Sequence, residues 1–179
     1  MAKTKTTPNP MREIRVAKVT LNIGTGKDQS NLERAMRLLK HITGIAPVKT
    51  TTTKRIAAWG LRPGLPIGCK ITMRHFDAQK IIPRLVASLD NKMTENQFDE
   101  NGNISFGIKE YIDIKDTKYE PEIGSMGLQC SITLERPGFR IKKRKLLKKT
   151  VPLHHRIAKT ESIEFMKTNF NIKMASDDE

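Results

Sequence analysis

Apolar and polar residues alternate in four stretches of the chain, which is the pattern of a half-buried β-strand. The stretches are residues 18–23, 66–74, 103–109 and 128–136. In the second stretch one face would carry Ile67, Cys69, Ile71 and Met73, and the other Gly68, Lys70, Thr72 and Arg74. A further strand is expected to begin at Pro47, which gives the sequence five candidate strands.

Two longer segments space their apolar residues as one face of a helix does. These residues are Leu32, Met36, Leu39 and Ile42 in the first segment, and Ile81, Ile82, Leu85, Val86 and Leu89 in the second. Asp28 or Ser30 can cap the first helix, and Gly44 ends it. Asp77 can cap the second helix, and Pro83 inside it should remove a hydrogen bond or bend the helix.

These elements predict an α+β fold, with helices packed on one face of a largely antiparallel sheet. The opposite face of the sheet would be exposed. Alternation lines this face with Lys18, Thr20, Asn22, Lys70, Thr72, Arg74, Gln129, Ser131 and Thr133. Such a face can simply be solvated, or its hydroxyl, amide and cationic groups can bind an RNA backbone.

Changes in composition divide the chain into four parts. Residues 1–12 are expected to be a flexible lead-in, and residues 13–139 an α+β RNA-binding domain with a basic loop at 50–65. Residues 140–174 follow as a basic C-terminal extension with a short helix, and residues 175–179 as an acidic tail.

The C-terminal extension opens with RIKKRKLLKK, residues 140–149, in which seven of ten residues are basic. A run of this kind can be a solvated tail, or it can become ordered when it binds RNA. Further along, Thr160 is expected to cap a short helix that carries Ile163, Met166 and Phe170.

The charge of the chain favours RNA for both the exposed face and the basic run. Lys and Arg number 33 against 19 Asp and Glu, which gives a net charge of +14, and a protein with this excess usually binds a polyanion. The sequence contains no apolar run typical of a transmembrane helix or a secretory signal, so we expect a cytoplasmic protein without a membrane partner. Cys69 and Cys130 lie in alternating strands, which favours two buried thiols over a disulfide or a zinc site.

The segment KTTTTKRIAAWGLRPG, residues 49–64, is typical of a strand that continues into an exposed basic loop. It carries Lys54, Arg55, Arg62 and the only tryptophan of the chain, Trp59, and it has no acidic residue. The ring can lie on a base or ribose while the cations contact phosphates. Alternatively, Trp59 packs the loop against itself.

Other motifs offer little chemistry. The turn at 22–27, NIGTGK, lacks the third glycine of a dinucleotide-binding turn and the spacing of a P-loop, so a simple turn is favoured. Its Gly24, Gly26 and Lys27 could still hold one RNA phosphate. His154 and His155 have no carboxylate or cysteine at metal-binding spacing, which favours an RNA contact over a metal site. We expect no catalytic residue, cofactor or metal.

Five segments of the sequence resemble the universal large-subunit ribosomal protein five family, called eleven in eukaryotic cytosolic ribosomes. In order they are VAKVTLNIGTG, HITGIAPVKT, GLRPGLPIGCKITMR, ENGNISFGIKEYI and GLQCSITLERPGF. The RPGF segment, the basic stretch after it and HHRIAK are similar to the archaeal and eukaryotic branch.

The resemblance implies a structural role in the large ribosomal subunit. Members of the family bind 5S rRNA in the central protuberance, where 23S-type rRNA and neighbouring central-protuberance proteins are further partners. They also contact the P-site tRNA through a mobile loop and bridge to a protein of the small-subunit head. That loop matches residues 49–64, and bacterial members have phenylalanine at the position of Trp59.

The resemblance and the alternation together give the expected contacts. The 5S rRNA contacts are Lys18, Asn22, Lys70, Thr72 and Arg74, and the tRNA contacts are Lys54, Arg55, Trp59 and Arg62. Further rRNA contacts are expected at Lys27, Arg140, Lys142, Lys143, Arg144, Lys145, His154, His155 and Arg156. The chain departs from the family at Ile45 and Ala46, which stand where an RNA-contacting glutamine and a lysine are common, and at Pro83.

Two other functions stay open from the sequence. A free-standing RNA chaperone or ribosome assembly factor would share the positive charge and bind many RNAs with little preference. A nucleotide-dependent enzyme that uses the turn at Gly24 and Gly26 would show saturable binding of ATP or NAD.

Overall fold

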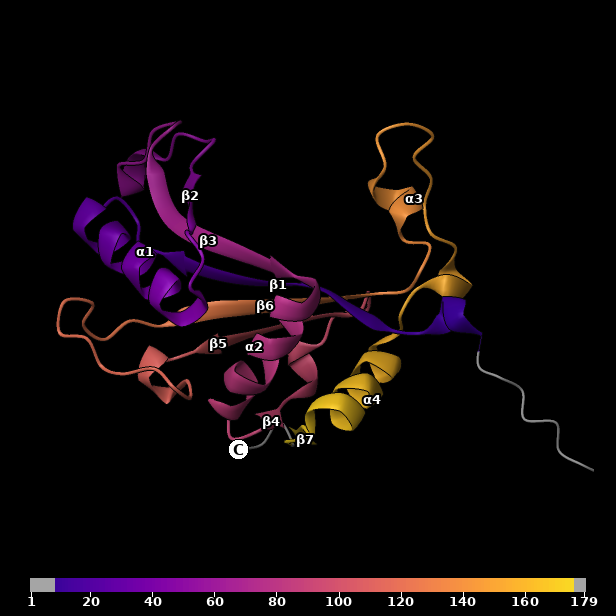
Figure 1. Cartoon of the computed structure of the whole chain (residues 1–179). Helices are drawn as coiled ribbons and strands as arrows, with labels where there is room; N and C mark the ends of the chain where they lie inside the picture. The colour runs from indigo at the N-terminus through magenta and orange to yellow at the C-terminus, as the bar shows by residue number, and fades with distance from the viewer. Residues whose placement is uncertain (1–8, 176–179) are drawn as a thin grey trace, which may run out of the picture.

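A computed structural model describes residues 9–175 of the chain, and a five-stranded antiparallel sheet forms its centre (Figure 1). The strands are β1 Arg15–Gly24, β2 Val48–Thr51, β3 Pro66–Arg74, β5 Asn103–Ile108 and β6 Leu128–Glu135. In space they follow the order β2-β3-β1-β6-β5. All four stretches of alternating polarity are strands of this sheet, and the strand expected after Pro47 is β2.

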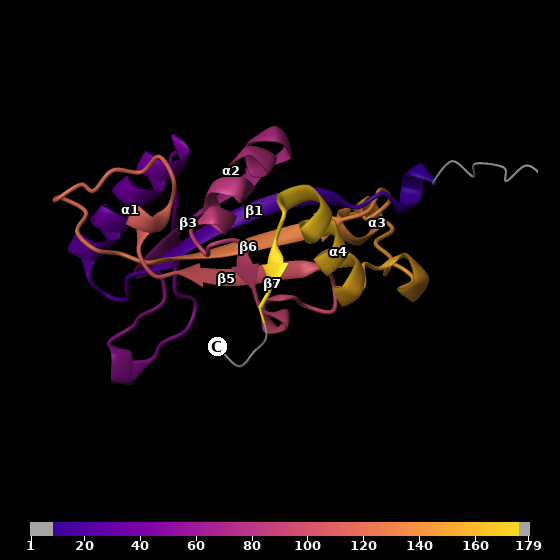
Figure 2. The same ribbon diagram turned by 90° about the horizontal axis from the view of Figure 1, so that it is seen from below.

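The helices are α1 Gln29–Thr43, α2 His75–Ala87, α3 Arg140–Lys143 and α4 Lys159–Phe170. Figure 2 shows α1 and α2 lying across one face of the sheet, with α4 beside them. A second, small sheet pairs β4 Lys92–Met93 in parallel with β7 Lys173–Met174. This arrangement confirms the predicted α+β fold. No helix within residues 9–175 is long and apolar enough to cross a bilayer.

The core lies between these helices and the sheet. Most inward residues of the three central strands are almost fully buried, each with at most 3% of its surface exposed. They are Val19, Leu21, Ile23, Cys69, Ile71, Met73, Leu128, Cys130, Ile132 and Leu134. The helices cover them with Leu32, Ala35, Leu38, Leu39, Ile42, Ala78, Ile81, Ile82, Leu85 and Val86. Burial of this apolar surface is the main force that holds the helical layer in place.

The helix boundaries confirm some predictions from the sequence and correct others. Gly44 ends α1 in the left-handed conformation, and its N–H donates to Lys40 O at 2.7 Å. Asp28 occupies the residue before α1, but its side chain makes no capping hydrogen bond. The caps predicted for the other two helices are wrong, because α2 begins at His75, ahead of Asp77, and α4 begins at Lys159, ahead of Thr160.

Local physical reasons explain why α2 and α4 begin at other residues than the sequence predicted. Strand β3 runs directly into α2, and His75 turns the chain with a φ of 55°. Asp77 therefore lies in the first turn of α2, where a negative charge still favours the helix dipole. At the start of α4 the side chain of Glu161 accepts a hydrogen bond from Ala158 N–H at 3.0 Å.

Pro83 lies inside α2, as the sequence indicates, and its side chain is exposed. Proline cannot donate to the carbonyl of the residue four positions earlier, which is Gln79. Gln79 is exposed as well. Both residues thus lie on the solvent side of α2, where a missing backbone hydrogen bond costs less than it would in the core.

Arg136 connects the end of β6 to two distant segments. Its side chain is only 7% exposed, and Nη2 donates to Glu161 Oε1 at 2.7 Å. Nε donates to Arg12 O at 3.1 Å, and Nη1 donates to Arg156 O at 3.0 Å. One guanidinium thus joins the N-terminal segment, the sheet and the entrance to α4.

The C-terminal segment that begins at Ile157 packs against the core of the main body. Ile157, Met166 and Ile172 are buried in the same core as the sheet residues, so core residues come from both sides of the expected boundary after residue 139. The expected division of the chain stays a prediction. Most of the expected lead-in, residues 1–8, and of the acidic tail, residues 176–179, lies outside the described residues.

Replacing Arg136 with alanine should destabilise the fold by about 3 kcal/mol, because it leaves three carbonyls and the Glu161 carboxylate without their buried partner. Urea unfolding followed by circular dichroism measures this free energy. Arg15→Ala is the matched control, since Arg15 and its partner Glu13 are both more than half exposed and such pairs contribute at most about 1 kcal/mol. Equal losses in the two variants would contradict this role of Arg136.

The two cysteines should resist alkylation in the folded protein near neutral pH. Burial raises the pKa of Cys69 to about 11 and that of Cys130 to about 12, and only the thiolate is a good nucleophile. Mass spectrometry after brief treatment with iodoacetamide should find no adduct on the native protein and two on the urea-unfolded protein. Rapid labelling of either thiol in the native protein would contradict the buried placement.

Candidate nucleic-acid interface

The strand register arranges the outward polar residues in three rows across the sheet. We call this surface the open face, because α1 and α2 pack on the other side (Figure 1). The rows are Arg74, Lys18, Thr133 and Asn103; Thr72, Thr20, Ser131 and Ser105; and Lys70, Asn22 and Gln129. The five residues expected to contact 5S rRNA therefore lie together on two neighbouring strands, β1 and β3.

Among the described residues, the cations of the open face have no acidic partner. Within residues 9–175, none of Lys18, Lys70 and Arg74 forms an ion pair. On the helical side, ion pairs join Arg37 to Glu122 and Arg84 to Asp116, and His41 Nδ1 lies 2.9 Å from Glu120 Oε1. The positive charge of the open face is thus not neutralised locally, which suits a polyanion.

Residues 52–65 form a hairpin between β2 and β3 that we call the β2–β3 arm. Ile56 and Leu61 exchange both backbone hydrogen bonds, at 3.1 and 3.0 Å, and Thr52 N–H donates to Leu65 O at 2.9 Å. Leu61 is 7% exposed, whereas Trp59 at the tip is 68% exposed. Leu61 therefore packs the arm, and the ring of Trp59 is available to a partner.

The β2–β3 arm is basic along its length. Lys54, Arg55 and Arg62 are exposed, and none forms an ion pair within the part of the chain that the structure describes. Lys27 lies beside the tip, since a Cβ built on Gly60 would be 4.0 Å from its Cδ. The expected tRNA contacts and Lys27 thus share one end of the molecule.

The glycine turn before α1 is a simple turn, as favoured from the sequence. The N–H groups of Thr25 and Gly26 both donate to Ile67 O, at 3.0 and 3.2 Å. These amides are occupied and cannot bind a phosphate at the same time. The antiparallel sheet also lacks the parallel βαβ unit that a dinucleotide site requires.

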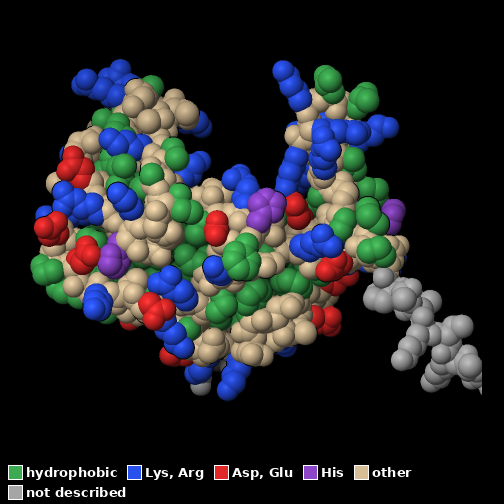
Figure 3. Space-filling view, in the orientation of Figure 1, with side chains coloured by type: hydrophobic (Ala, Val, Ile, Leu, Met, Phe, Trp, Pro, Cys, Tyr) green, Lys and Arg blue, Asp and Glu red, His purple; other side chains and the backbone are tan. Residues whose placement is uncertain are grey.

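Residues 140–150 form a second projection, which we call the C-terminal arm. It begins with α3, and Lys149 N–H closes it by donating to Ile141 O at 3.2 Å. Figure 3 shows the two arms on the same side of the molecule, with basic side chains on both and a hollow between them. Lys143 forms an ion pair with Glu135 at the end of β6.

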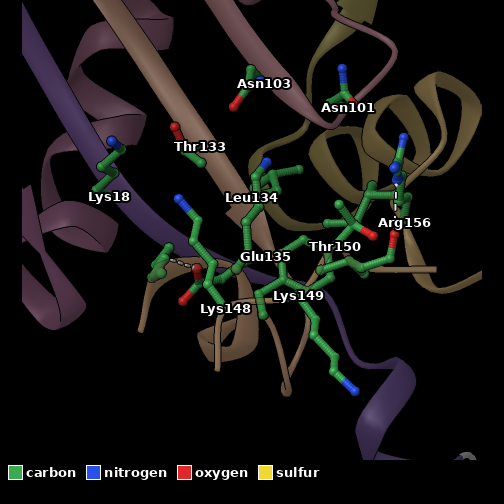
Figure 4. A pocket seen from close by; sticks show the side chains of 15 residues that line it. Lys18, Asn101, Asn103, Thr133, Leu134, Glu135, Lys148, Lys149, Thr150 and Arg156 are labelled. Atoms are coloured by element: carbon green, nitrogen blue, oxygen red, sulfur yellow. Dashed lines mark hydrogen bonds and ion pairs between the residues drawn. The ribbon is translucent and has the colours of Figure 1, made fainter. Parts of the chain in front are cut away.

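A cavity of about 730 Å³ lies between the C-terminal arm and the open face (Figure 4). Strand residues Lys18, Thr133 and Asn103 line one side, and Lys148 and Thr150 the other. The walls meet because the turn before β5 packs closely on the C-terminal part. A Cβ on Gly102, whose φ is 76°, would lie only 2.9 Å from Cβ of Ile157.

The three residues of the HHR segment, 154–156, lie in different surroundings. His154 is exposed. The Nε2 atom of His155 lies 2.9 Å from Pro137 O, and its ring meets Phe139 edge-on with centroids 5.7 Å apart. Arg156 donates from Nε to Val151 O at 3.2 Å. His155 and Arg156 thus support the base of the C-terminal arm.

Metal binding finds no support in the described residues. Residues 9–175 contain no group of three or more His, Cys, Asp or Glu side chains placed to hold a metal ion.

Several residues of this surface were not identified from the sequence. Ser105 and Asn103 belong to the open face, and the alternation of β5 would have placed them there. Asn101, Lys148 and Lys149 line the cavity, but no local pattern indicates this, because the turn before β5 and the C-terminal arm meet only in the folded chain.

Comparison with known proteins identifies the family. A family model described as ribosomal protein L5 matches residues 9–62, and a second model, which describes the C-terminus of the same ribosomal family, matches residues 66–173. Together the two matches span nearly the whole described chain.

Several curated relatives are named large ribosomal subunit protein uL5. The relative from Sulfurisphaera tokodaii is 44% identical over 173 residues, which cover 96% of this chain and 97% of the relative. The relative from Methanobrevibacter smithii is 41% identical, covering 94% and 99%, and that from Nanoarchaeum equitans is 43% identical, covering 93% and 98%. The chain therefore belongs to the uL5 family of large-subunit ribosomal proteins, and its role is structural rather than catalytic.

Proposed function

We propose that the open face binds 5S rRNA in the central protuberance of the large subunit, with 23S-type rRNA and neighbouring proteins around it. The β2–β3 arm contacts the P-site tRNA and helps to bridge to a protein of the small-subunit head. One observation carries the proposal: three rows of hydrogen-bonding side chains cross a sheet face between two basic arms, and their cations have no acidic partner within residues 9–175.

The chemistry of the open face suits double-stranded RNA. An A-form helix presents a wide, shallow minor groove with 2′-hydroxyls, which a protein reads by shape and by sugar and phosphate contacts. Thr20, Thr72 and Ser131 supply short hydroxyls, while the longer Lys70 and Arg74 can reach phosphates. Asn22 already donates to Gln129 at 3.3 Å, which orients both amides before RNA binds.

The β2–β3 arm suits a separate task. Trp59 is exposed at the tip and offers a planar surface for a base or ribose, while Lys54 and Arg62 can track the backbone. The tip is separated from the rows of the open face by the length of the hairpin (Figure 1). We therefore assign 5S rRNA to the open face and the tRNA to the arm.

Arg74→Ala should weaken the affinity for 5S rRNA roughly tenfold, the scale of one hydrogen-bonded charge contact. Trp59→Ala should leave that affinity unchanged, because the ring serves the other RNA. Filter binding at physiological salt measures both. Arg37→Ala is the control, since Arg37 pairs with Glu122 on the helical side. A loss in Trp59→Ala as large as that in Arg74→Ala would refute the division between face and arm.

The affinity for 5S rRNA should fall steeply with salt. If about six cations contact phosphates, log K should decrease with log salt at a slope of about 4 to 5, since each contact contributes roughly 0.7 to 0.9. The Lys70→Ala variant should reduce this slope by about one contact. A slope near zero in the wild-type protein would contradict phosphate-dominated binding.

The proposal is tested directly by competition. Labelled 5S rRNA bound to the purified protein is challenged with tRNA and with a random RNA of equal length. We expect neither competitor to displace 5S rRNA at equimolar concentration. Equal affinity for all three RNAs would instead support an RNA chaperone or assembly factor.

A further inference from the structure

We propose that the cavity between the C-terminal arm and the open face holds one unpaired nucleotide of the bound rRNA, extruded from its helix. The inference rests on the proposed function, because it takes RNA as the partner. It goes further by assigning a binding mode to a site that combines an aromatic ring, two asparagine amides and a rim of lysines.

The size of the cavity agrees with this ligand. Its volume of about 730 Å³ lies within the range of sites that enclose small organic molecules, about 300 to 1,000 Å³. The lining is mixed: Leu134, Phe139, Val151 and Ile157 are apolar, and the remaining residues are polar or charged. A nucleotide needs both kinds of wall, because its base has apolar faces and a hydrogen-bonding edge.

Two asparagines line the cavity, and a carboxylate outside the lining holds one of them. Asn103 Nδ2 donates to Asp99 Oδ2 at 2.9 Å. The hydrogen bond from Asn103 is the largest cause that lowers the pKa of Asp99, so the carboxylate is charged near neutral pH. Each amide has two N–H donors and an oxygen acceptor, so holding one donor leaves groups for the edge of a base.

Phe139 is the aromatic residue among those that line the cavity. Its ring is half-buried and is held by the edge-on contact with His155, which itself binds Pro137 O. A ring in this fixed position gives a base a surface to stack on, at little cost in conformational entropy.

Lysines at the rim of the cavity supply positive charge for the phosphates on both sides of an extruded nucleotide. Lys18 reaches the cavity from β1, and Lys142 and Lys148 from the C-terminal arm. None of these three forms an ion pair within residues 9–175. Phosphates that precede and follow the extruded nucleotide would therefore meet a cation on either wall.

The test uses short RNA duplexes that differ by one nucleotide. Four duplexes carry a single-nucleotide bulge of A, C, G or U, and a fifth is fully paired. Fluorescence anisotropy with the full-length protein measures each affinity, with free AMP, CMP, GMP and UMP as competitors. We expect at least one bulged duplex to bind about tenfold more tightly than the paired duplex, the scale of one base stacked on an aromatic ring.

Two variants locate the preference in the cavity. Phe139→Leu should abolish most of the tenfold difference and leave the affinity for the paired duplex unchanged. Asn103→Ala should also abolish most of the difference, and only the ratio of the two affinities is read for this variant, because Asn103 belongs to the open face as well. Asn31→Ala in α1 and Phe76→Leu, whose ring is 64% exposed on α2, are the matched controls and should keep the difference. Thermal unfolding of every variant verifies the fold, and the Phe139→Leu variant retains apolar volume in case Asn103→Ala is unstable.

The outcomes separate this inference from the proposed function. Equal affinity of the wild-type protein for bulged and paired duplexes would overturn the nucleotide site, even if 5S rRNA still bound tightly and selectively. If a free mononucleotide competes at micromolar concentration, the cavity is a site for mononucleotides, and the proposal that its ligand is a nucleotide within RNA is wrong. Absence of binding to 5S rRNA and to every duplex would overturn both proposals.

Discussion

The double pairing of β1, with β3 on one side and β6 on the other, determines where the rest of the molecule lies. In both registers Val19, Leu21 and Ile23 point toward the helices, and Lys18 and Asn22 point away. A slip of one residue would exchange the two sets and bury a lysine under α2, at a cost far greater than the sheet could offset. The core and the open face are therefore two consequences of one register.

A second constraint places the C-terminal arm. Arg136 is buried at the end of β6 and holds both the N-terminal segment, at Arg12, and the entrance to α4 through three separate hydrogen bonds. The carboxyl of Glu161 keeps a pKa below its usual range: burial raises it, but the hydrogen bonds from Ala158 and Arg136 outweigh that effect. The Glu161 carboxylate that accepts the hydrogen bond from Arg136 therefore stays ionised at mildly acidic pH. Residues 140–150 leave and return near this point, which directs the arm toward the open face rather than the helices.

These two constraints explain what the sequence could and could not predict. Alternation in β1, β3, β5 and β6 is a local signal, so the sheet, the core and the five contacts expected on β1 and β3 could be placed beforehand. The caps predicted at Asp77 and Thr160 were wrong because other local features set those helix starts: β3 passes directly into α2, and the side chain of Glu161 accepts a hydrogen bond from Ala158 N–H. The cavity could not be predicted at all, since Asn101 and Lys148 are brought together only by the return of the chain after Arg136.

The distribution of rigid and protruding parts follows from the same architecture and bears on how RNA would be selected. Thr20 and Ser131 stand on backbone that is paired with a strand on both sides, and Thr72 on backbone that is paired with β1, so their hydroxyls keep fixed spacings with little loss of backbone freedom on binding. Long cations such as Arg55 and Lys145 stand on the arms, where side chains can adjust to the phosphates they meet. Charge at the edges attracts any nucleic acid over a distance, whereas short neutral groups at the centre accept only a surface of matching shape. A uniformly basic face would bind RNA as strongly but would discriminate less, which makes the neutral middle row of Thr72, Thr20, Ser131 and Ser105 the part of the surface best suited to selectivity.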